Sequence, residues 1–481
     1  MIYLEINYFL IKVKLLKIMF VYKIKLLIYL LVKVSKYLFY KLLYMVNFDI
    51  CVVKINVKLN NLDLNSPLNL NNIETVSGSG FFISKNLIIT CYHVVKYAIN
   101  IEVIYKLDDI YQAHIKYIFP DDDIAIIELE KNINNILLLD FKMIKIKNFT
   151  KVYTIGYPMD SMNIIKTKGI ISGFQQSYIQ TDAAVNPGNS GGPLVIFDKH
   201  DKTYKIIGVN VSKISDAENS NFVVPSYRFI ILLKAIIEKT CLTDQIVHKK
   251  PLLLFHYQKL IQPKLRTILF KEHLSKFNNI GVMVTSLNKK NFLNKYFKIG
   301  DILLSINNNY IDYNGYVKLN LYPEKMALHN IGYWFLNNDE IDVEILSDGL
   351  LKKIKIKLEI SNKNLMDTYC LPNYPNYYIN KKNLIFSIVT YEHINNLESL
   401  DINLVQRIMI ANRYFDQKDL FTVYLSGLDQ AIYQTDFTKY PIGDIIIEIN
   451  DTSFNNYEEY MEIMKNDIYK IKTLQNKTFY I

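Results

Sequence analysis

From residue 51 onward the chain alternates between short apolar runs and polar turns. Residues 53–58 read VKINVK, in which apolar and polar side chains alternate. Similar short runs occupy residues 77–84, 87–90, 101–105, 114–118, 124–129, 152–155, 169–172, 194–197 and 206–211. Many short strands separated by turn signals predict an all-β barrel or sandwich. A helical pattern at 227–239 (YRFIILLKAIIEK) is predicted to close this first folded unit.

The remainder of the chain contains an internal repeat. The phrase IGDILLSINNNYI at 299–311 returns as IGDIIIEINDTSF at 442–454, which is 143 residues later. It resembles the strand–turn–strand phrase of PDZ domains. Two copies predict two related modules, at 250–362 and 363–481, joined to the first unit by a linker around Lys249, Lys250 and Pro251.

Residues 1–48 are apolar but repeatedly broken by lysine. Between Lys12 and Lys41 the longest lysine-free stretch, 26–32, has seven residues. A spanning helix needs about 20 mostly apolar residues, so a simple membrane span is not predicted. An amphipathic membrane-surface helix or a targeting segment is favoured. A signal-anchor, and a leader preceding a later start at Met45, stay open as alternatives.

Composition narrows the function classes. A length of 481 residues suggests about three domains. The net charge is +10, but residues 1–50 contribute +6 of it, which disfavours a basic nucleic-acid-binding body. The four cysteines, at 51, 91, 241 and 370, lie too far apart for a zinc knuckle, a CxxC redox pair or a disulfide scaffold. The sequence predicts no metal and no cofactor.

The stretch QTDAAVNPGNSGGPLV at 180–195 carries the strongest chemical signal. A nucleophilic serine needs a tight turn that exposes its oxygen, and backbone N–H groups aimed at the developing oxyanion. Gly188, Gly191 and Gly192 permit such a turn around Ser190. The N–H groups of Gly188 and Ser190, with Asn189 between them, would form the oxyanion hole. The alternative is an ordinary serine in a glycine-rich surface turn.

The predicted general base is His93, which follows the apolar run 87–90 in LIITCYHVV; none of the seven other histidines has such a setting. A carboxylate is needed to fix the imidazole tautomer. Three consecutive aspartates precede the predicted strand at 124–127, and Asp123 adjoins it, so Asp123 is the expected orienting residue. Asp121 and Asp122 are predicted to be solvated loop charges. The alternatives are a half-buried core histidine and a plain acidic turn.

Six phrases occur in order along the chain: SGSGFFI, ITCYHVV, DIAIIEL, IGYP, QTDAAVNPGNSGGPL and IGVNV…NFVVPS. Together they resemble the HtrA/DegP-type (Deg) serine proteases, and the tail most resembles the plant-type and fungal Deg proteases. The resemblance extends from about 49 to 475. It implies a mainly β protein, with a chymotrypsin-like double β-barrel protease domain at 49–245. A PDZ domain at 250–362 and a divergent PDZ-like domain at 363–481, both α+β, would follow.

By resemblance, His93, Asp123 and Ser190 take the roles of the catalytic triad, and no triad position is lost. One departure from the family pattern is that bulkier Cys91 and Tyr92 precede the histidine. A thiol reagent that reached Cys91 would therefore inhibit without Cys91 being catalytic.

The same resemblance implies the substrate pocket. In this fold the residue six positions before the nucleophile lies at the base of the S1 pocket, and here it is the uncharged Ala184. A basic P1 side chain would find no counter-ion, so small or medium aliphatic P1 residues are expected. Gly208, Val209 and Asn210 are expected to form the other wall.

The leading interpretation is a serine endopeptidase that degrades unfolded or damaged proteins. It is expected to act without ATP, since no GxxxxGK[ST] string is present. By resemblance, the first PDZ-like unit would capture an extended segment or a C-terminus near 252–257, whereas the second is expected only to hold the oligomer together. The resemblance also implies a trimer-based homo-oligomer, and the leader suggests an organellar, mitochondrial or membrane-associated location. The alternatives are a PDZ-based chaperone or scaffold and a processing protease with one dedicated substrate. A lipase or esterase fits poorly, since the serine is not in a strand–GxSxG–helix elbow.

Overall fold

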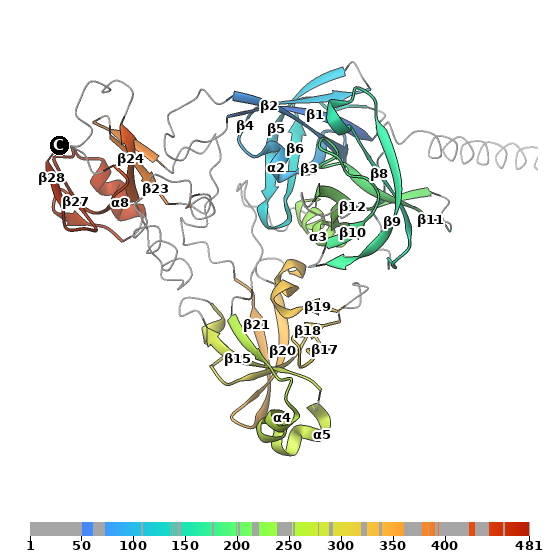
Figure 1. Cartoon of the computed structure of the whole chain (residues 1–481), viewed down its shortest axis with the longest axis vertical. Helices are drawn as coiled ribbons and strands as arrows, with labels where there is room; N and C mark the ends of the chain where they lie inside the picture. Colours follow the sequence, from blue (N-terminus) through green and yellow to red (C-terminus); the bar gives the residue numbers. More distant parts are fainter. Residues whose placement is uncertain are drawn as a thin grey trace, which may run out of the picture.

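A computed structural model gives the structure of the chain (Figure 1). Apart from a few single residues, it describes 51–60, 73–106, 109–134, 140–141, 146–175, 178–198, 203–213, 221–237, 255–277, 279–287, 292–318, 325–335, 339–359, 378–382, 384–389, 423–428, 442–455 and 457–480. The expected targeting segment at 1–48 lies outside these ranges. Within them, no helix is long and apolar enough to cross a membrane.

Six strands close the first barrel, in the order β1-β2-β3-β6-β5-β4. They are β1 (Val52–Asn60), β2 (Ile73–Phe82), β3 (Leu87–Cys91), β4 (Ala98–Tyr105), β5 (Asp109–Phe119) and β6 (Ile124–Leu129). Their inward side chains, among them Ile55, Phe81 and Ile126, form one buried core. The short apolar runs of the sequence therefore become barrel strands because each can bury one face.

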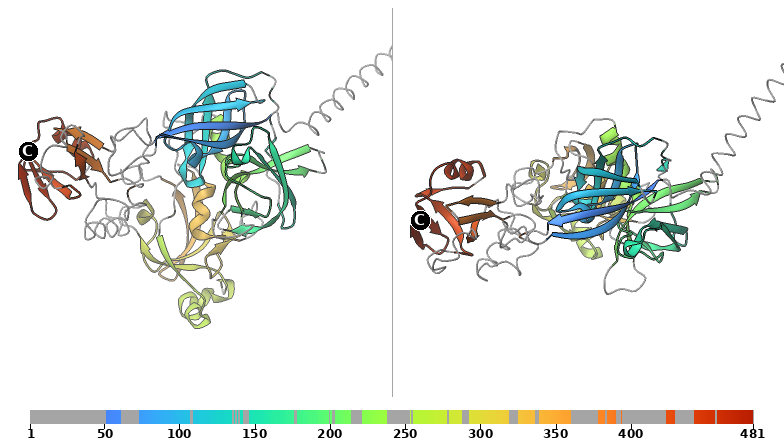
Figure 2. Two further views of the ribbon diagram at one scale, coloured as in Figure 1. Left: turned by 45° about the horizontal axis from the view of Figure 1, so that its top comes forward. Right: turned by 90° about the horizontal axis from the view of Figure 1, so that it is seen from above.

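A second barrel follows in the order β11-β8-β9-β10-β13-β12, closed by pairing of β11 with β12. Its strands are β8 (Lys151–Gly156), β9 (Ile165–Gln175), β10 (Tyr178–Thr181), β11 (Pro193–Asp198), β12 (Thr203–Lys213) and β13 (Asn221–Pro225), with the short β7 (Asp140–Phe141) beside β12. Val195 and Ile206 of this barrel belong to the core of the first. The arrangement confirms the predicted chymotrypsin-like double β-barrel (Figure 2).

Helix α3 (Ser226–Ile237) follows the second barrel directly. Phe229 of this helix is buried in the first core, where its ring meets Phe141 edge-to-face at 5.7 Å. Tyr227, two residues earlier in the same helix, is buried instead in the core of the next unit. The helix therefore contacts both units along one turn.

The second unit is a sheet in the order β14-β15-β16-β20-β21 with short helices. Its main elements are β14 (Phe255–Lys259), α4 (Pro263–Phe270), α5 (Leu274–Phe277), β15 (Val282–Leu287), β16 (Ile302–Ile306), β17 (Asn309–Tyr310), η6 (Leu328–Trp334), β20 (Glu340–Ser347) and β21 (Leu350–Lys357). The minor elements are β18 (Tyr316–Val317), β19 (Met326–Ala327), η4 (Lys271–His273) and η5 (Phe292–Lys295).

A third unit has the strand order β22-β23-β24-β25-β27-β28. Its elements are β22 (Tyr378–Lys381), β23 (Leu384–Ile388), β24 (Val423–Leu428), β25 (Ile445–Ile449), β26 (Thr452–Ser453), α8 (Tyr457–Met464), β27 (Lys470–Thr473) and β28 (Thr478–Tyr480). Phe386, Ile446 and Tyr460 are among the residues of its separate core.

The sequence repeat corresponds to a structural repeat. Strands β16 and β17 form a hairpin, as do β25 and β26, and the two hairpins start and end at equivalent positions of the repeated phrase. Asn307 and Asn308 have positive φ angles in the first turn, as Asn450 and Asp451 have in the second. Two positive φ angles are the mark of a type I′ turn, which asparagine and aspartate tolerate. The repeated IN phrase therefore encodes the same hairpin twice.

Candidate active site

The candidate base lies at the open end of the first barrel. His93 occupies the short helix α2 (Tyr92–Val95), immediately after β3. Asp123 follows the single 3-10 turn η2 (Pro120–Asp122) and immediately precedes β6. Because β3 pairs with β6 and Cys91 lies opposite Ile124, the two side chains project from neighbouring strand ends.

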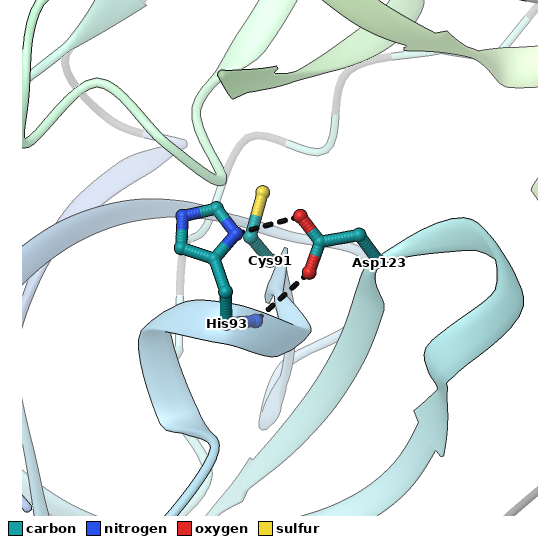
Figure 3. Close-up of side chains that lie close together, drawn as sticks. All are labelled: Cys91, His93 and Asp123. Carbon is teal, nitrogen blue, oxygen red and sulfur yellow. Dashed lines mark hydrogen bonds and ion pairs between the residues drawn. The ribbon is translucent and has the colours of Figure 1, made fainter. Parts of the chain in front are cut away.

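One carboxylate holds the histidine at two points (Figure 3). Oδ2 of Asp123 lies 2.6 Å from Nδ1 of His93, and Oδ1 accepts the backbone N–H of His93 at 2.9 Å. A carboxylate accepts but does not donate when ionised, so the Nδ1 position carries the proton and Nε2 is left to accept one. Of the three consecutive aspartates, Asp123 is the one that meets the imidazole.

The candidate nucleophile sits in a tight turn before β11. Gly188 and Gly191 have φ angles of +95° and +86°, which glycine adopts without strain. A Cβ on Gly191 would lie 2.2 Å from the Ser79 carbonyl oxygen, so only glycine fits there. Asn189 donates its N–H to Asn186 O at 2.9 Å, whereas the N–H groups of Gly188 and Ser190 donate no hydrogen bond within the described residues. Those two groups are available to an incoming oxyanion.

Ser79 fastens this turn to the first barrel, and sequence analysis gave it no role. Its hydroxyl donates to Gly188 O at 2.6 Å and accepts the N–H of Tyr157 at 2.9 Å. Its backbone N–H donates to Ser190 O at 2.8 Å. The available signal was its place between the glycines of SGSGFFI, which allow close approach of two backbones.

The hydroxyl of Ser190 points to the second barrel. Its Oγ donates to Val211 O of β12 at 2.9 Å. Within the described residues no hydrogen bond joins Ser190 to His93, so a proton transfer between the two would require the Ser190 side chain to rotate about χ1. Catalytic hydrogen bonds commonly tighten only when substrate is bound.

Cys91 lies next to His93 and Asp123 (Figure 3). Its thiol is buried and donates to Asn210 O at 3.1 Å. Burial first, and the nearby Asp123 carboxylate second, raise the pKa of Cys91 well above its ordinary value, although a hydrogen bond from Gly191 lowers it in part. The thiol is therefore protonated at neutral pH and is a poor target for thiol reagents.

Cys91, His93 and Asp123 are also the one group of potential metal ligands found among the described residues. Their ligand atoms lie within 4.8 Å of one another. A cation there would have to displace the Nδ1 hydrogen bond between His93 and Asp123. The arrangement therefore suits proton transfer better than metal binding.

Among the residues expected in the S1 pocket, Asn210 is hydrogen-bonded to the serine turn. Ala184 is exposed, and its carbonyl accepts hydrogen bonds from the hydroxyls of Thr167 at 2.8 Å and Thr154 at 3.2 Å. Asn210 exchanges backbone hydrogen bonds with Gly191 and Gly192 at 2.8 and 2.9 Å, which sets β12 against the turn.

Gly208 and Val209 of the same strand are buried, and the Val209 side chain belongs to the core. Only the backbone of Val209 can therefore line a pocket. A Cβ on Gly208 would meet Val224 O at 2.6 Å, so this position tolerates little more than glycine.

The expectation for Asp122 was wrong. Asp121 is partly exposed, but Asp122 is fully buried and forms an ion pair with Arg228 of α3, which is itself buried. The partner lies far away in the sequence, and a run of three aspartates gives no sign of which one turns inward. Arg228 is one of four arginines in a lysine-rich chain, and this rarity was the available signal.

Comparison with known proteins finds a trypsin-like peptidase domain and relatives among the HtrA/DegP-type serine proteases. The family profile described as "Trypsin-like peptidase domain" matches residues 78–203. A Do-like 13 protease of Arabidopsis thaliana is 28% identical over 350 residues, covering 68% of this chain and 66% of its own length. A Rickettsia conorii protein named "Probable periplasmic serine endoprotease DegP-like" is 26% identical over 431 residues, 84% of this chain and 75% of its own.

The vertebrate HtrA-type relatives match a smaller part of this chain, about 34% of it for the one from Bos taurus. The chain spans about a third of the length of one from Bos taurus, at 34% identity. Among solved structures, an HtrA-type protease, AlgW, with a bound tripeptide has a TM-score of 0.47 and 20% identity, covering 64% of this chain and 93% of that one.

Proposed function

Because the chain carries a trypsin-like peptidase domain and is a homologue of the HtrA/DegP-type serine proteases, we propose that it is a serine endopeptidase acting through an acyl-enzyme. Ser190 attacks the scissile carbonyl, and His93 Nε2 takes its proton and later delivers it to the leaving amine. Asp123 holds the Nδ1 proton and stabilises the imidazolium. This proposal rests mainly on the two hydrogen bonds between the Asp123 carboxylate and His93, at 2.6 and 2.9 Å.

The oxyanion would be stabilised by the N–H groups of Gly188 and Ser190. Both are unengaged within the described residues, whereas that of Asn189 is taken by Asn186. Asn189 would therefore contribute by setting the turn rather than by donating its N–H to the oxyanion. Donors fixed in advance toward developing charge supply a large share of the rate enhancement in acyl transfer.

We assign the S1 pocket to Ala184, with the β12 backbone at Gly208, Val209 and Asn210 as its other wall. Ala184 brings no charge, so small or medium aliphatic P1 residues are expected. A panel of peptides that differ only at P1 tests this directly. Preference for arginine or lysine would reject the assignment.

The second and third units are proposed to be PDZ-like modules. The third would hold the oligomer together, and the second would bind an extended peptide or a C-terminus. Strand β14 (Phe255–Lys259) supports this, because it pairs only with β15 among the described strands and so presents a free edge for strand addition. Fluorescence anisotropy with a labelled peptide ending in an apolar residue measures such binding. An amidated peptide of the same sequence controls for recognition of the free carboxylate.

Substrates, assembly and location complete the proposal. We expect unfolded or damaged polypeptides to be degraded without ATP, by a trimer-based homo-oligomer in an organellar, membrane-associated setting. The location rests on the Lys-rich apolar composition of residues 1–48, and the assembly on resemblance to the family. Light scattering measures the assembly, and a monomer at working concentration would reject it.

The decisive experiment incubates the purified full chain with unfolded casein, beside Ser190→Ala, in the absence of ATP. Cleavage by the parent alone supports the endopeptidase and Ser190 as its nucleophile. If neither protein cleaves casein, even with an added apolar C-terminal peptide, the result favours the alternative of a PDZ-based scaffold. Cleavage of a few specific peptides, with casein left intact, would point to a dedicated processing protease.

A further inference from the structure

A buried ion pair stands immediately beside the candidate orienting aspartate. The guanidinium of Arg228 contacts Oδ1 of Asp122, and the two side chains are 1% and 0% exposed. The same nitrogen of Arg228, Nη2, donates to the Asp121 carbonyl at 3.3 Å. The guanidinium carbon lies 5.0 Å from the centroid of the Tyr178 ring. One arginine therefore holds two consecutive residues of the turn that ends at Asp123.

That turn needs to be held. Asp123 has a φ angle of +52°, in the left-handed region that non-glycine residues rarely adopt. Its N–H closes the turn on Pro120 O at 3.0 Å, and its carbonyl accepts the N–H of Tyr92, also at 3.0 Å. Because these bonds join the Asp123 backbone to the turn and to the helix that carries His93, a movement of the turn would carry the Asp123 carboxylate with it.

A charged pair is a poor choice for stability alone. Desolvation of two buried charges offsets most of their attraction, and apolar pairs of similar volume are often as stable. Arg228 does differ from an apolar side chain in direction, because its planar guanidinium donates a hydrogen bond to the Asp121 carbonyl at 3.3 Å. The contribution of Arg228 is therefore geometric.

The position of Arg228 is itself fixed from both sides. Phe229 is buried in the core of the first barrel, and Tyr227 is buried in the core of the second unit. Helix α3 thus carries Arg228 into the interior between two anchored neighbours. The second unit is connected to the Asp123 turn through three consecutive residues of one helix.

On these grounds we propose that Asp122 and Arg228 are a positioning pair that aligns the Asp123 carboxylate on His93. The inference rests on the proposed serine endopeptidase function for its kinetic consequence. Neither residue touches substrate; both act through the conformation of Asp123.

The test compares full-length Asp122→Leu/Arg228→Met with the parent. Single substitutions leave a buried charge and can fail to fold, whereas the double substitution keeps an apolar pair of similar volume. We expect the melting temperature to stay near that of the parent. We expect kcat on an aliphatic P1 peptide to fall roughly 10- to 100-fold, with KM nearly unchanged, as misplacement by about 1 Å produces elsewhere.

A matched control removes another ion pair with one buried partner. Lys205 and Asp140 are joined at 2.9 Å where β12 pairs with β7. Asp140→Leu/Lys205→Met should leave kcat within about twofold of the parent value. An ion pair with one solvent-exposed partner contributes little to stability, and this pair links β12 to β7 rather than to the Asp123 turn.

A second readout does not depend on proteolysis. The proton shared by His93 Nδ1 and Asp123 is expected to resonate far downfield in the proton spectrum of the parent, and to shift or broaden in the Asp122/Arg228 double variant. If the double variant keeps both the resonance and kcat, the pair is only structural and the proposal is overturned. If the parent cleaves nothing, the endopeptidase assignment fails, while the resonance alone still supports or overturns the positioning role.

Discussion

At the scale of single residues, the site depends on one carboxylate making two hydrogen bonds to one histidine. The bond to the His93 backbone fixes where the residue sits, and the bond to Nδ1 fixes which way the ring faces. Neither bond alone would set both the position and the tautomer. In the proposed mechanism, Asp123 is therefore an orienting group first and a source of charge second.

Replacing Asp123 by asparagine tests this role. The amide keeps the shape but can donate to Nδ1, which favours the tautomer that cannot take the Ser190 proton. We expect kcat to fall by a factor on the order of 10⁴ with the fold retained. Peptide hydrolysis at neutral pH measures it, with Asp121→Asn as the control; a loss under tenfold would contradict the assignment.

Cys91 illustrates how burial removes reactivity. Since burial and Asp123 raise its pKa, the thiol keeps its proton through neutral pH. We expect iodoacetamide at about pH 8 to leave Cys91 unmodified in the folded protein and to alkylate it rapidly in urea. Mass spectrometry of the Cys91 peptide decides, and fast alkylation of the folded protein would count against the buried thiol.

The sequence allowed His93, Asp123 and Ser190 to be proposed from their local patterns. Each stands at the end of a recognisable apolar run or inside a glycine-rich turn. The buried Asp122 and the clamping Ser79 were not predictable in the same way. Their roles depend on Arg228 and on the 188–190 backbone, which only the folded chain brings to them.

At the scale of elements, the turn before β11 is where two barrels meet. Ser79 of β2 bonds to it from the first barrel, and Asn210 of β12 bonds to it from the second. A nucleophile placed in this turn is held by both barrels at once. Small changes in the turn therefore disturb the site and the packing together.

Gly191→Ala is the sharpest test of that turn. Its φ is +86°, and the added Cβ would lie 2.2 Å from Ser79 O and 2.3 Å from Thr90 Oγ1. We expect a loss of roughly 2–4 kcal/mol of unfolding free energy and of measurable hydrolysis. Urea unfolding and a peptide assay measure both.

Gly173→Ala is the matched control for that substitution. A Cβ on Gly173, in β9, would approach only Gln180 Oε1, at 3.8 Å. We expect this variant to have the unfolding free energy and the cleavage activity of the parent. Equal tolerance of alanine at positions 191 and 173 would mean that the turn has another conformation.

Elements with strong local signals were predictable, and elements with weak local signals were not. The repeated hairpins follow from Asn-Asn and Asn-Asp between apolar runs. Strands β10 and β13, of four and five residues, were not predicted as strands; β10 ends in two polar residues and β13 ends in a proline. Their pairing partners, β9 and β12, supply what their own sequence lacks.

At the scale of the whole molecule, three units have separate cores. The third contains a buried histidine, His393, whose ring lies 5.7 Å from that of Tyr424, edge-to-face. Desolvation by burial lowers the pKa of His393 to about 3. The folded unit therefore excludes a proton that the unfolded chain binds readily.

This predicts acid sensitivity of the third unit. The unfolded chain takes up the proton near pH 6.5 and the folded unit only near pH 3, so stability is full above 6.5 and declines as pH falls between these values. The loss approaches about 1.4 kcal/mol per pH unit. Hydrogen exchange in β23 and β24 at two pH values measures it.

A phenylalanine at 393 keeps the contact with Tyr424 and cannot titrate. His393→Phe should therefore flatten the decline, whereas replacing the exposed His256 in the same way should not. An unchanged pH slope in His393→Phe would show that another group titrates.

The two outer strands of the second sheet are chemically unequal. Strand β21 carries exposed lysines at 352, 353, 355 and 357, whereas β14 carries a single lysine at its end. Lysines along an outer strand repel a second copy brought alongside it, which guards against runaway polymerisation. If a peptide binds by strand addition, as proposed, the lysines of β21 leave β14 as the strand that it can join. The module would then have one flank open to docking and an opposite flank that keeps neighbours apart.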